Sequence, residues 1–548
     1  MQDEMTPKDP QKENTPTGSQ GEKTPKVGGA YAHYVLFVLV IVYVFNFIDR
    51  NILSILSQDI QADLGVTDAQ MGFLYGTVFA VFYAVFGIPL ARFADVWVRR
   101  SLISLGLVFW SAMTALSGFA RSFPVLAAYR IGVGIGEASA SPAAYSMLSD
   151  YYPQRLRATV LAIYSSGVYI GGGIGLFLGG FIMETWNTSF PDPTTAPLNL
   201  KGWHAAFLAV GIPGIFMALW VRSLREPIRG ASEGLISAEH PNPLGVLRTE
   251  LAAMTPILNL YGLAREGASI RDNLVAGLFI TVIAWGLIEL TGNVPQWVAL
   301  GIGVYVVYSW VQSLKARDPV TYHMIFQSKA MIYTMLAFPT ISFVSYGVGY
   351  WTAPLLMRLH DVSATEVGMY IGLGNALGGL LGVTLGGIFG DKFKQRHPAG
   401  RLLIGYIAVF GTAPLVLWMV YTDSLYMAFA LNFAHHLFSA AWVGIPPSTA
   451  ADLVLPRMRA VAGAYYILIN TMLGLALGPY VMGQLSDSFA STGMDSAESL
   501  RTAIACTLLI FVATVALLTL AWKNLPRDEA TRLDRARALG EKVEEVST

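Results

Sequence analysis

Long apolar segments separated by short polar stretches dominate the sequence between residues 31 and 522. The hydrocarbon core of a bilayer is about 30 Å thick, so a helix needs about 20 apolar residues to cross it. Fourteen segments have this length, and each predicts a membrane-spanning helix. They cover residues 31–57, 70–94, 101–120, 124–149, 157–183, 203–222, 273–291, 296–314, 330–355, 364–389, 401–420, 424–450, 459–485 and 502–522.

The chain repeats part of itself, which indicates two equivalent halves. An aspartate followed by an Arg-x-Arg pair stands at Asp150, Arg155 and Arg157 and returns at Asp452, Arg457 and Arg459. The segment 91–95 likewise returns as 387–391, and both repeats lie at helix–helix turns on one side. Two six-helix bundles placed in parallel, related by an axis along the membrane normal, explain both repeats.

The helices from 273 to 314 belong to neither half, so we predict an all-α polytopic membrane protein in which two six-helix bundles flank an extra two-helix hairpin. We expect this hairpin at the periphery and dispensable for the substrate path. The linker before it contains a segment, 244–263, that is expected to lie along the membrane as an amphipathic helix. The predicted parts are a disordered tail 1–30, a first bundle 31–222, a linker 223–272, a hairpin 273–314, a second bundle 330–522 and a tail 523–548.

Composition agrees with a membrane protein and excludes several functions. The chain is 54% hydrophobic and 13% charged, whereas charged residues make up about 25% of a soluble domain. The 36 basic and 36 acidic residues give no net field that would attract nucleic acid. Cys506 is the single cysteine, so an intrachain disulfide or a thiolate metal cluster is impossible. We therefore expect no metal and no cofactor.

Basic residues are distributed unequally between the two sides of the membrane. If the N-terminus is cytoplasmic, the inside connections carry more than fourteen lysines and arginines and the outside ones carry only Arg121, Lys201, Arg358 and Arg501. Translocated loops are poor in such residues. We therefore predict a multi-pass protein of the plasma (inner) membrane with both termini in the cytoplasm.

Four charged residues fall inside predicted helices. Asp49 and Arg50 lie in the outer half of the first helix, and Arg130 and Glu137 lie seven residues apart on one face of the fourth. A charge in the bilayer centre is costly, so such residues need a partner, a water-filled cavity or a function. Burial and neighbouring arginines act on Glu137 in opposite directions, as expected for a reversible proton carrier. The alternative is a structural pair, Asp49–Arg130, that only holds the two helices together.

A second set of charged residues marks the inside turns. We predict a cytoplasmic gate in which acidic side chains of one half meet helix N-termini of the other half. The alternative is that these residues only set the orientation. The predicted gate residues are Asp95, Arg99, Asp391, Lys392, Arg155, Arg157, Arg457 and Arg459.

The residues that carry these features resemble a known family. The turn at Asp95 and Arg99, the Arg130 helix and the repeat from Asp150 resemble major facilitator signatures across most of residues 31–522. The strings 46–50 and 130–139 resemble the spinster family more narrowly. This resemblance implies the major facilitator fold and transport of an amphiphilic lipid, such as a lysophospholipid or sphingosine-1-phosphate, with proton coupling in at least some members.

The same resemblance implies roles for individual residues. Asp49 and Glu137 would be the protonation pair, while Arg50 and Arg130 would hold the carboxylates or a substrate phosphate, which suits the planar guanidinium. The sequence departs from the family's turn motif at Ala91, Val96 and Val98, and from the antiporter motif at Leu176. The direction of transport is therefore not predicted.

Two other functions fit the same charged residues and topology. A carrier of small organic anions would use the same arginines in a narrower cavity, and a non-transporting receptor would share the topology. An intramembrane lipid enzyme is disfavoured, because His435 and His436 lack an acidic or cysteine partner at a suitable spacing. We expect a monomer whose partners are the substrate, protons and the bilayer. The predicted cavity residues are Asn46, Tyr75, Phe79, Phe338, Tyr346, His435 and Trp442.

Overall fold

The structure of the chain is a computed structural model that describes residues 28–230, 232, 241–360 and 362–541. The predicted disordered tail 1–30 lies outside the described residues except for its last three positions, and residues 542–548 of the second tail also lie outside them. In the described part of the chain every regular element is a helix. Helices satisfy all backbone polar groups internally, as a hydrocarbon environment requires.

The first bundle contains the helices before the linker. They are α1 (Ala30–Ile55), α2 (Ser57–Leu64), α3 (Asp68–Gly72), α4 (Val78–Val96), α5 (Arg99–Ser117), α6 (Phe123–Glu137), α7 (Ala140–Tyr151), α8 (Arg157–Ser165), α9 (Gly167–Ser189) and α10 (Gly202–Arg222). One π-helical turn, η1 (Phe73–Thr77), joins α3 to α4. Short 3₁₀ turns occupy Gln154–Leu156, Pro193–Thr195 and Pro197–Asn199.

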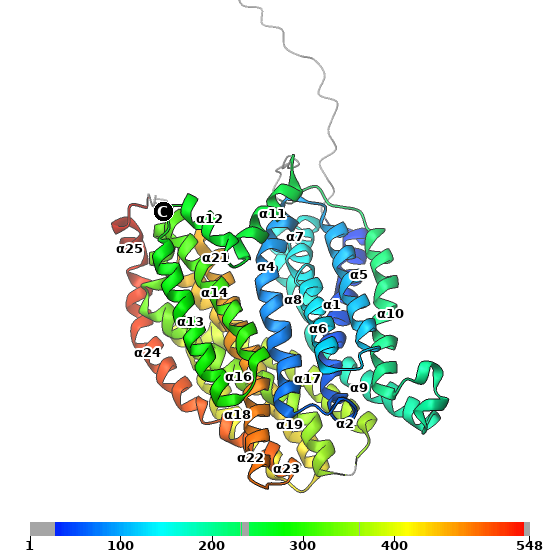
Figure 1. Cartoon of the computed structure of the whole chain (residues 1–548). Coiled ribbons are helices and arrows are strands. Elements are labelled where there is room, and N and C mark those ends of the chain that lie inside the picture. Colours follow the sequence, from blue (N-terminus) through cyan, green and yellow to red (C-terminus); the bar gives the residue numbers. More distant parts are fainter. Residues whose placement is uncertain (1–27, 231, 233–240, 361, 542–548) are drawn as a thin grey trace, which may run out of the picture.

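The rest of the chain forms the linker, the hairpin and the second bundle (Figure 1). The linker and hairpin helices are α11 (Pro243–Met254), α12 (Leu258–Arg265), α13 (Ile270–Thr291) and α14 (Val294–Arg317). The second bundle contains α15 (Pro319–Phe326), α16 (Lys329–Leu359), α17 (Ala364–Arg396), α18 (Leu403–Tyr421), α19 (Leu425–Ala440), α20 (Ile445–Leu453), α21 (Arg459–Asn470), the π-helical turn η8 (Thr471–Leu475), α22 (Leu477–Ser491), α23 (Ser496–Thr507), α24 (Ile510–Ala530) and α25 (Arg532–Ala538). Two 3₁₀ turns lie at Gly400–Leu402 and Pro456–Met458.

Thirteen helical stretches of the described chain are long and apolar enough to cross a membrane. Each overlaps one of the predicted segments. The remaining predicted segment, 124–149, is helical but interrupted, because α6 ends at Glu137 and α7 begins at Ala140. The break follows immediately after the buried carboxylate of Glu137. The equivalent helix of the second half is broken in the same region, between Ala440 and Ile445.

Glycine stripes let the helices within each bundle approach closely. A methyl group on Gly171 would lie 2.3 Å from the carbonyl oxygen of Val44, and one on Gly175 would lie 2.9 Å from the backbone of Ile48. α9 therefore packs directly on the backbone of α1. Gly378 and Gly382 of α17 give the same close approach to α19. These stripes act as packing seams, which is their usual role in membrane helices.

The two bundles meet along two seams. At one seam α9 packs against α17, and methyl groups on Gly173 and Gly372 would each lie 2.4 Å from the other residue's carbonyl oxygen. At the other seam α3 and η1 pack against α22. α14 of the hairpin covers this second seam: Gly303 lies against Val81 of the first bundle and Met472 of the second.

The hairpin lies outside the two bundles, as expected, but α14 packs against both of them. Trp297 stacks edge-on against Tyr480 with ring centroids 5.5 Å apart, and Trp310 stacks on Tyr465 at 4.6 Å. α13 is the more peripheral helix of the pair, since Asn273 is its one buried residue. α14 thus contacts both halves of the protein where they meet.

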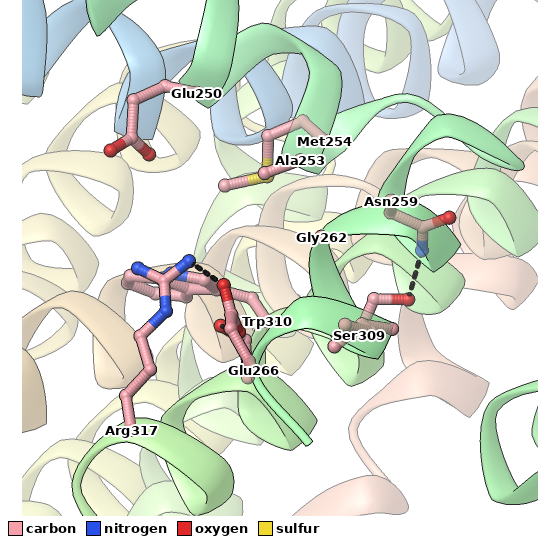
Figure 2. A pocket seen from close by; sticks show the side chains of 11 residues that line it. Glu250, Ala253, Met254, Asn259, Gly262, Glu266, Ser309, Trp310 and Arg317 are labelled. Carbon is pink, nitrogen blue, oxygen red and sulfur yellow. Dashed lines mark hydrogen bonds and ion pairs between the residues drawn. The ribbon is translucent and has the colours of Figure 1, made fainter. Parts of the chain in front are cut away.

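The linker is tied to the hairpin by buried polar side chains. Asn259 of α12 donates to Ser309 of α14 over 2.9 Å, and Arg317 pairs with Glu266 (Figure 2). The pocket between them holds about 30 Å³, room for about one water molecule rather than a substrate. The predicted single helix over 244–263 is wrong, because the chain turns at Ile257, which has a φ of 77°.

Both described chain ends lie on one face, which we call the terminal face. The amide of Gly28 donates to the carbonyl of Tyr151 at the end of α7, and Arg532 of α25 donates to the carbonyl of Asp452 at the end of α20. α7, α11, α12 and α25 lie on the same side of the molecule (Figure 1). The opposite end of the molecule, which carries α2, α3 and α23, is called the far face.

Candidate functional site

The four charged residues predicted inside the membrane come together within the first bundle. α1 supplies Asp49 and Arg50, and α6 supplies Arg130 and Glu137. The Nη2 atom of Arg50 donates to Oε2 of Glu137 over 2.9 Å, and both side chains are buried. A buried ion pair is stabilising only when its geometry is good. This pair has hydrogen-bond geometry and links α1 to α6.

Aromatic rings surround the guanidinium group of Arg50. Its central carbon lies 3.9 Å from the ring centre of Phe79, 4.5 Å from that of Phe47 and 5.6 Å from that of Tyr83. Cation–π attraction is strongest where water is excluded. Arg50 is therefore held by rings from α1 and α4 as well as by the carboxylate of Glu137.

The predicted structural pair Asp49–Arg130 takes a different form. Nη1 of Arg130 donates to the backbone carbonyl of Asp49 over 3.1 Å, while the carboxylate of Asp49 faces Trp110 and Thr114 of α5. The two residues are neighbours, as predicted, but their contact is not an ion pair. Arg130 thus retains donor atoms that Asp49 does not use.

Several buried polar atoms of this cluster have no hydrogen-bond partner within the described chain. Arg130, Glu137 and Asp49 are at most 1% exposed and Arg50 is 7% exposed. Buried polar groups without a partner are rare and costly, and they point to a functional role. The unpartnered atoms are Asp49 Oδ1, Glu137 Oε1, Arg50 Nε, Arg130 Nε and Arg130 Nη2.

The predicted cavity residues are mostly buried. Tyr346 is partly exposed, whereas Asn46, Tyr75, Phe79, Phe338, His435 and Trp442 are buried. Tyr75 stacks on Tyr350 of the second bundle at 4.4 Å, and Phe338 lies 6.0 Å from Trp442. Both ring nitrogens of His435 lack a partner within the described residues. A role of these residues in lining a substrate path stays a prediction.

The predicted gate residues contact their own bundles in this structure. Arg99 pairs with Asp150 over 2.5 Å, and Arg401 pairs with Asp452 over 2.6 Å and with Asp391 over 2.8 Å. Arg99 and Arg401 are 302 positions apart, as are Asp150 and Asp452, so the internal repeat produces the same ion pair twice. Arg401 was missed, although the repeat contained the signal for it.

The other predicted gate residues lie around these pairs. Asp95 lies 3.9 Å from Arg92, and Arg157 donates to Ser232 over 2.8 Å. Arg459 donates to the carbonyl of Ala451 over 3.3 Å. Arg155 and Lys392 are exposed. Whether these residues join the two bundles in another conformation stays a prediction.

The chain segment that follows each bundle forms hydrogen bonds or ion pairs with residues at the helix ends of that bundle. After α10, Glu226 accepts from the backbone amides of Arg99 and Arg100 at the start of α5, and Arg229 donates to carbonyls at the end of α4. After α25, Glu541 pairs over 2.6 Å with Arg457, which lies in the turn before α21 and also pairs with Asp318 over 2.7 Å; we call these two ion pairs the Arg457 clamp. Charged side chains thus satisfy helix ends on the terminal face.

The Arg457 clamp predicts a pH-dependent contribution to stability. Burial alone would raise the pKa of Asp318, but hydrogen bonds from Arg457 and Thr321 lower it, and the bond from Arg457 lowers the pKa of Glu541. Carboxylates with lowered pKa values stabilise the fold above their ordinary values, about 4, and this contribution is lost as the pH falls through the folded-state values. Arg457→Gln should therefore lower the melting temperature in detergent at pH 7 by about 1–2 °C.

The same difference should be smaller at about pH 3, because protonation of the carboxylates as the pH falls through their folded-state pKa values removes the charge that Arg457 binds. Arg459→Gln is the matched control, because Arg459 lies two residues away and, within the described residues, bonds only the carbonyl of Ala451. An equal loss at both pH values would show that the clamp does not act through these carboxylates.

A cross-bundle cluster that the sequence did not predict closes the far face. Both carboxylate oxygens of Asp68 accept from Arg358, over 2.8 and 2.5 Å, and one also accepts from Ser486 over 2.7 Å. The carboxylate of Asp487 accepts from the amides of Asp68 and Ala69 at the start of α3 over 3.0 and 2.8 Å. We call Asp68, Arg358 and Asp487 the far-face gate.

Further contacts between the bundles gather toward the same face. Ser54 donates to the carbonyl of Tyr350 over 2.6 Å, and Thr365 donates to Glu184. Above the gate lies an open hollow of about 430 Å³ lined by Gln58, Gln61 and the gate residues. The bundles are thus joined at the far face, whereas the predicted gate residues of the terminal face contact their own bundles.

Comparisons with known proteins agree with this architecture. A family model described as Major Facilitator Superfamily matches residues 39–479. An MFS-type efflux pump of Mycolicibacterium smegmatis is 27% identical over 455 residues, which cover 82% of this chain and 83% of the pump. The protein spinster of Drosophila melanogaster is 23% identical over 465 residues, which cover 83% of this chain and 62% of that protein.

Solved structures give a similar result. The crystal structure of a bacterial homolog of the human lysosomal transporter spinster, in an inward-facing and unoccupied conformation, superposes with a TM-score of 0.68 at 27% identity. The match covers 91% of this chain and 99% of that structure. A bacterial homologue of human drug peptide transporters superposes with a TM-score of 0.57 at 15% identity, which shows a shared fold alone.

Proposed function

The chain belongs to the major facilitator superfamily and is a spinster-like secondary transporter, and from this premise we propose that it moves an amphiphilic lipid by proton-coupled alternating access. The predicted fold class and the prediction that the chain is not an enzyme are confirmed by the same matches. The observation that supports the proposal is the buried cluster of two arginines and two carboxylates with unpartnered polar atoms.

In this proposal Arg50 exchanges one anion for another. In the structure its guanidinium binds the carboxylate of Glu137. A proton on Glu137 removes that negative charge, so that Arg50 becomes available to a phosphate or carboxylate of the substrate. Loss of the proton restores the Arg50–Glu137 pair and displaces the substrate. Proton binding and substrate binding then favour one another, which is a coupling free energy between two sites.

We propose separate roles in substrate binding for Arg130 and for the aromatic rings around Arg50. Arg130 retains unpartnered donor atoms close to Asp49, so it is the proposed second contact for an anionic headgroup. The rings of Phe47, Phe79 and Tyr83 flank Arg50 and provide an apolar border suited to an amphiphile. A small organic anion would need the arginines but not this border.

In alternating access the two faces of the protein open in different states, one face at a time. The far-face gate holds the bundles together, and in the proposed cycle it must open while the terminal face closes. The terminal face carries the excess of basic residues, so we propose that it is cytoplasmic and that the membrane is the plasma membrane. We also propose a monomer, because each bundle pair is complete within one chain.

Counterflow in proteoliposomes tests the proposed substrate class. Vesicles preloaded with one lysophospholipid should accumulate a labelled lysophospholipid at pH 6 faster than at pH 8, whereas a panel of small organic anions should give no accumulation. Accumulation of the organic anions alone would replace the lipid proposal by the anion carrier. No flux of either class with protein that still binds lysolipid would favour a receptor.

A further inference from the structure

The helices that form the second seam each contain a π-helical turn. η1 interrupts the long helix from Asp68 to Val96, and η8 interrupts the one from Pro456 to Ser491. A π-helical turn holds one residue more than an α-helical turn, and such turns are rare and frequently lie at functional sites. Here one occurs in each bundle, and η1 and η8 contact each other.

Backbone atoms meet directly where the two turns cross. A methyl group on Gly76 of η1 would lie 2.5 Å from the carbonyl oxygen of Leu475 of η8, and one on Gly72 would lie 2.4 Å from that of Pro479. The hydroxyl of Thr77 donates to the carbonyl of Ala476 over 2.7 Å, and both residues are buried. The π-helical turns therefore shape a crossing that leaves no room for a side chain.

α3 depends on the opposite bundle for its position. It is five residues long and lies between Gly65, whose φ is 65°, and η1. Backbone amides at the start of α3 donate to Asp487, and the carboxylate of Asp68 accepts from Arg358 and Ser486. The helix that α3 packs against most is α22. These contacts all cross between the bundles, whereas α22 also packs on α16 and α23 of its own bundle.

We propose that η1 is the moving joint of the far-face gate: it is π-helical when the gate is closed and becomes α-helical when the gate opens. Loss of one residue from the turn rotates α3 by about 100° about its axis. Each side chain of α3 then takes the angular position that its predecessor in the chain holds now. Asp68 turns away from Arg358, and the gate cannot reform until the π-helical turn returns. This inference depends on the proposed function in one respect: the far face must open during the transport cycle.

Two glycine substitutions test the crossing. Gly76→Ala places a methyl group against the carbonyl of Leu475 and should hold the far face open, while Gly87→Ala, farther along the same helix, meets no atom within 4 Å. Both changes alter helix propensity equally. The reporter is Ser54→Cys in a Cys506→Ser background, labelled by a maleimide from the far face. We expect Gly76→Ala to speed labelling about tenfold and Gly87→Ala to leave it unchanged; equal rates in the two variants would overturn the proposal.

A second measurement separates rotation from a rigid opening. Ala69→Cys and Met71→Cys report on two faces of α3, since Ala69 packs toward Tyr480 of the opposite bundle and Met71 packs within the main core. In a background with the gate opened by Arg358→Gln, rotation moves Met71 to the position of Gln70, which is partly exposed. Faster labelling at Met71→Cys supports the joint. Faster labelling at Ala69→Cys alone, or at neither position, overturns it, and neither readout depends on which substrate is carried.

Discussion

Glu137→Gln is expected to reduce proton-driven accumulation of substrate by about tenfold or more while leaving counterflow in place. Glutamine keeps the shape of the side chain but neither releases nor takes up a proton. The coupling between two sites is typically worth a factor of about 5–150 in affinity, so gradient-driven uptake should fall by about ten- to a hundredfold. The measurement is lysolipid uptake in proteoliposomes with and without an inward proton gradient, compared with counterflow at equal pH.

Two further variants make this result specific. Removing one partner of a buried ion pair costs about 3–5 kcal/mol, because the other charge stays buried without compensation. The double variant Glu137→Gln/Arg50→Gln removes both charges and should restore the melting temperature without restoring proton-driven uptake. Glu289→Gln is the matched control, since Glu289 lies in the hairpin on an exposed face and bonds Trp285. An unchanged response to the gradient in Glu137→Gln would remove Glu137 from the coupling role.

Arg358→Gln is expected to shift the protein toward a state that is open at the far face. The variant deletes both hydrogen bonds from Arg358 to Asp68. The Arg358 side chain is 11% exposed and the Asp68 side chain is 8% exposed. Loss of one partner in a largely buried pair is worth about 3 kcal/mol or more, which corresponds to about a hundredfold change in the ratio of closed to open states. A cysteine at Ser54, buried below the gate, should react faster with an impermeant maleimide by about that factor.

The control for this shift lies on the same face. Arg501 pairs with Glu498 three residues away within α23, so Arg501→Gln removes a far-face ion pair that does not join the bundles. Its labelling rate should equal that of the parent protein. If Arg358→Gln also labels at the parent rate, the Asp68–Arg358 pair is not what holds the far face closed.

Local sequence properties predicted the helices well, because the thickness of the bilayer sets the length of apolar sequence that each spanning helix needs. Each segment meets this requirement independently of the others. The internal repeat likewise predicted two halves, and the pair Arg99–Asp150 returns as Arg401–Asp452 in the structure. The prediction failed where tertiary contacts outweigh hydrophobicity. An apolar run over 124–149 gave no sign that the helix breaks after Glu137, and a predicted peripheral hairpin contains one helix, α14, that packs against both bundles.

The far-face gate shows why the sequence did not predict contacts between the two bundles. Asp68 was not singled out from the sequence, and Arg358 was counted only as one of four basic residues on the outside. Asp68 and Arg358 are 290 positions apart, and their meeting depends on how two bundles close against each other. Sequence spacing carries no information about such a contact, because the contact exists only in one arrangement of the bundles.

The sequence by itself determined that this protein crosses a membrane many times, that it is built from two related halves, and that Asp49, Arg50, Arg130 and Glu137 carry charge inside the first half. Only the tertiary structure decided that Arg50 pairs with Glu137, that Arg130 bonds a backbone carbonyl, and that two π-helical turns face each other below the far-face gate. The physical reason is one of range. Hydrophobic burial in a bilayer acts on about 20 consecutive residues, whereas ion pairs and helix crossings select among arrangements of helices that are equally hydrophobic.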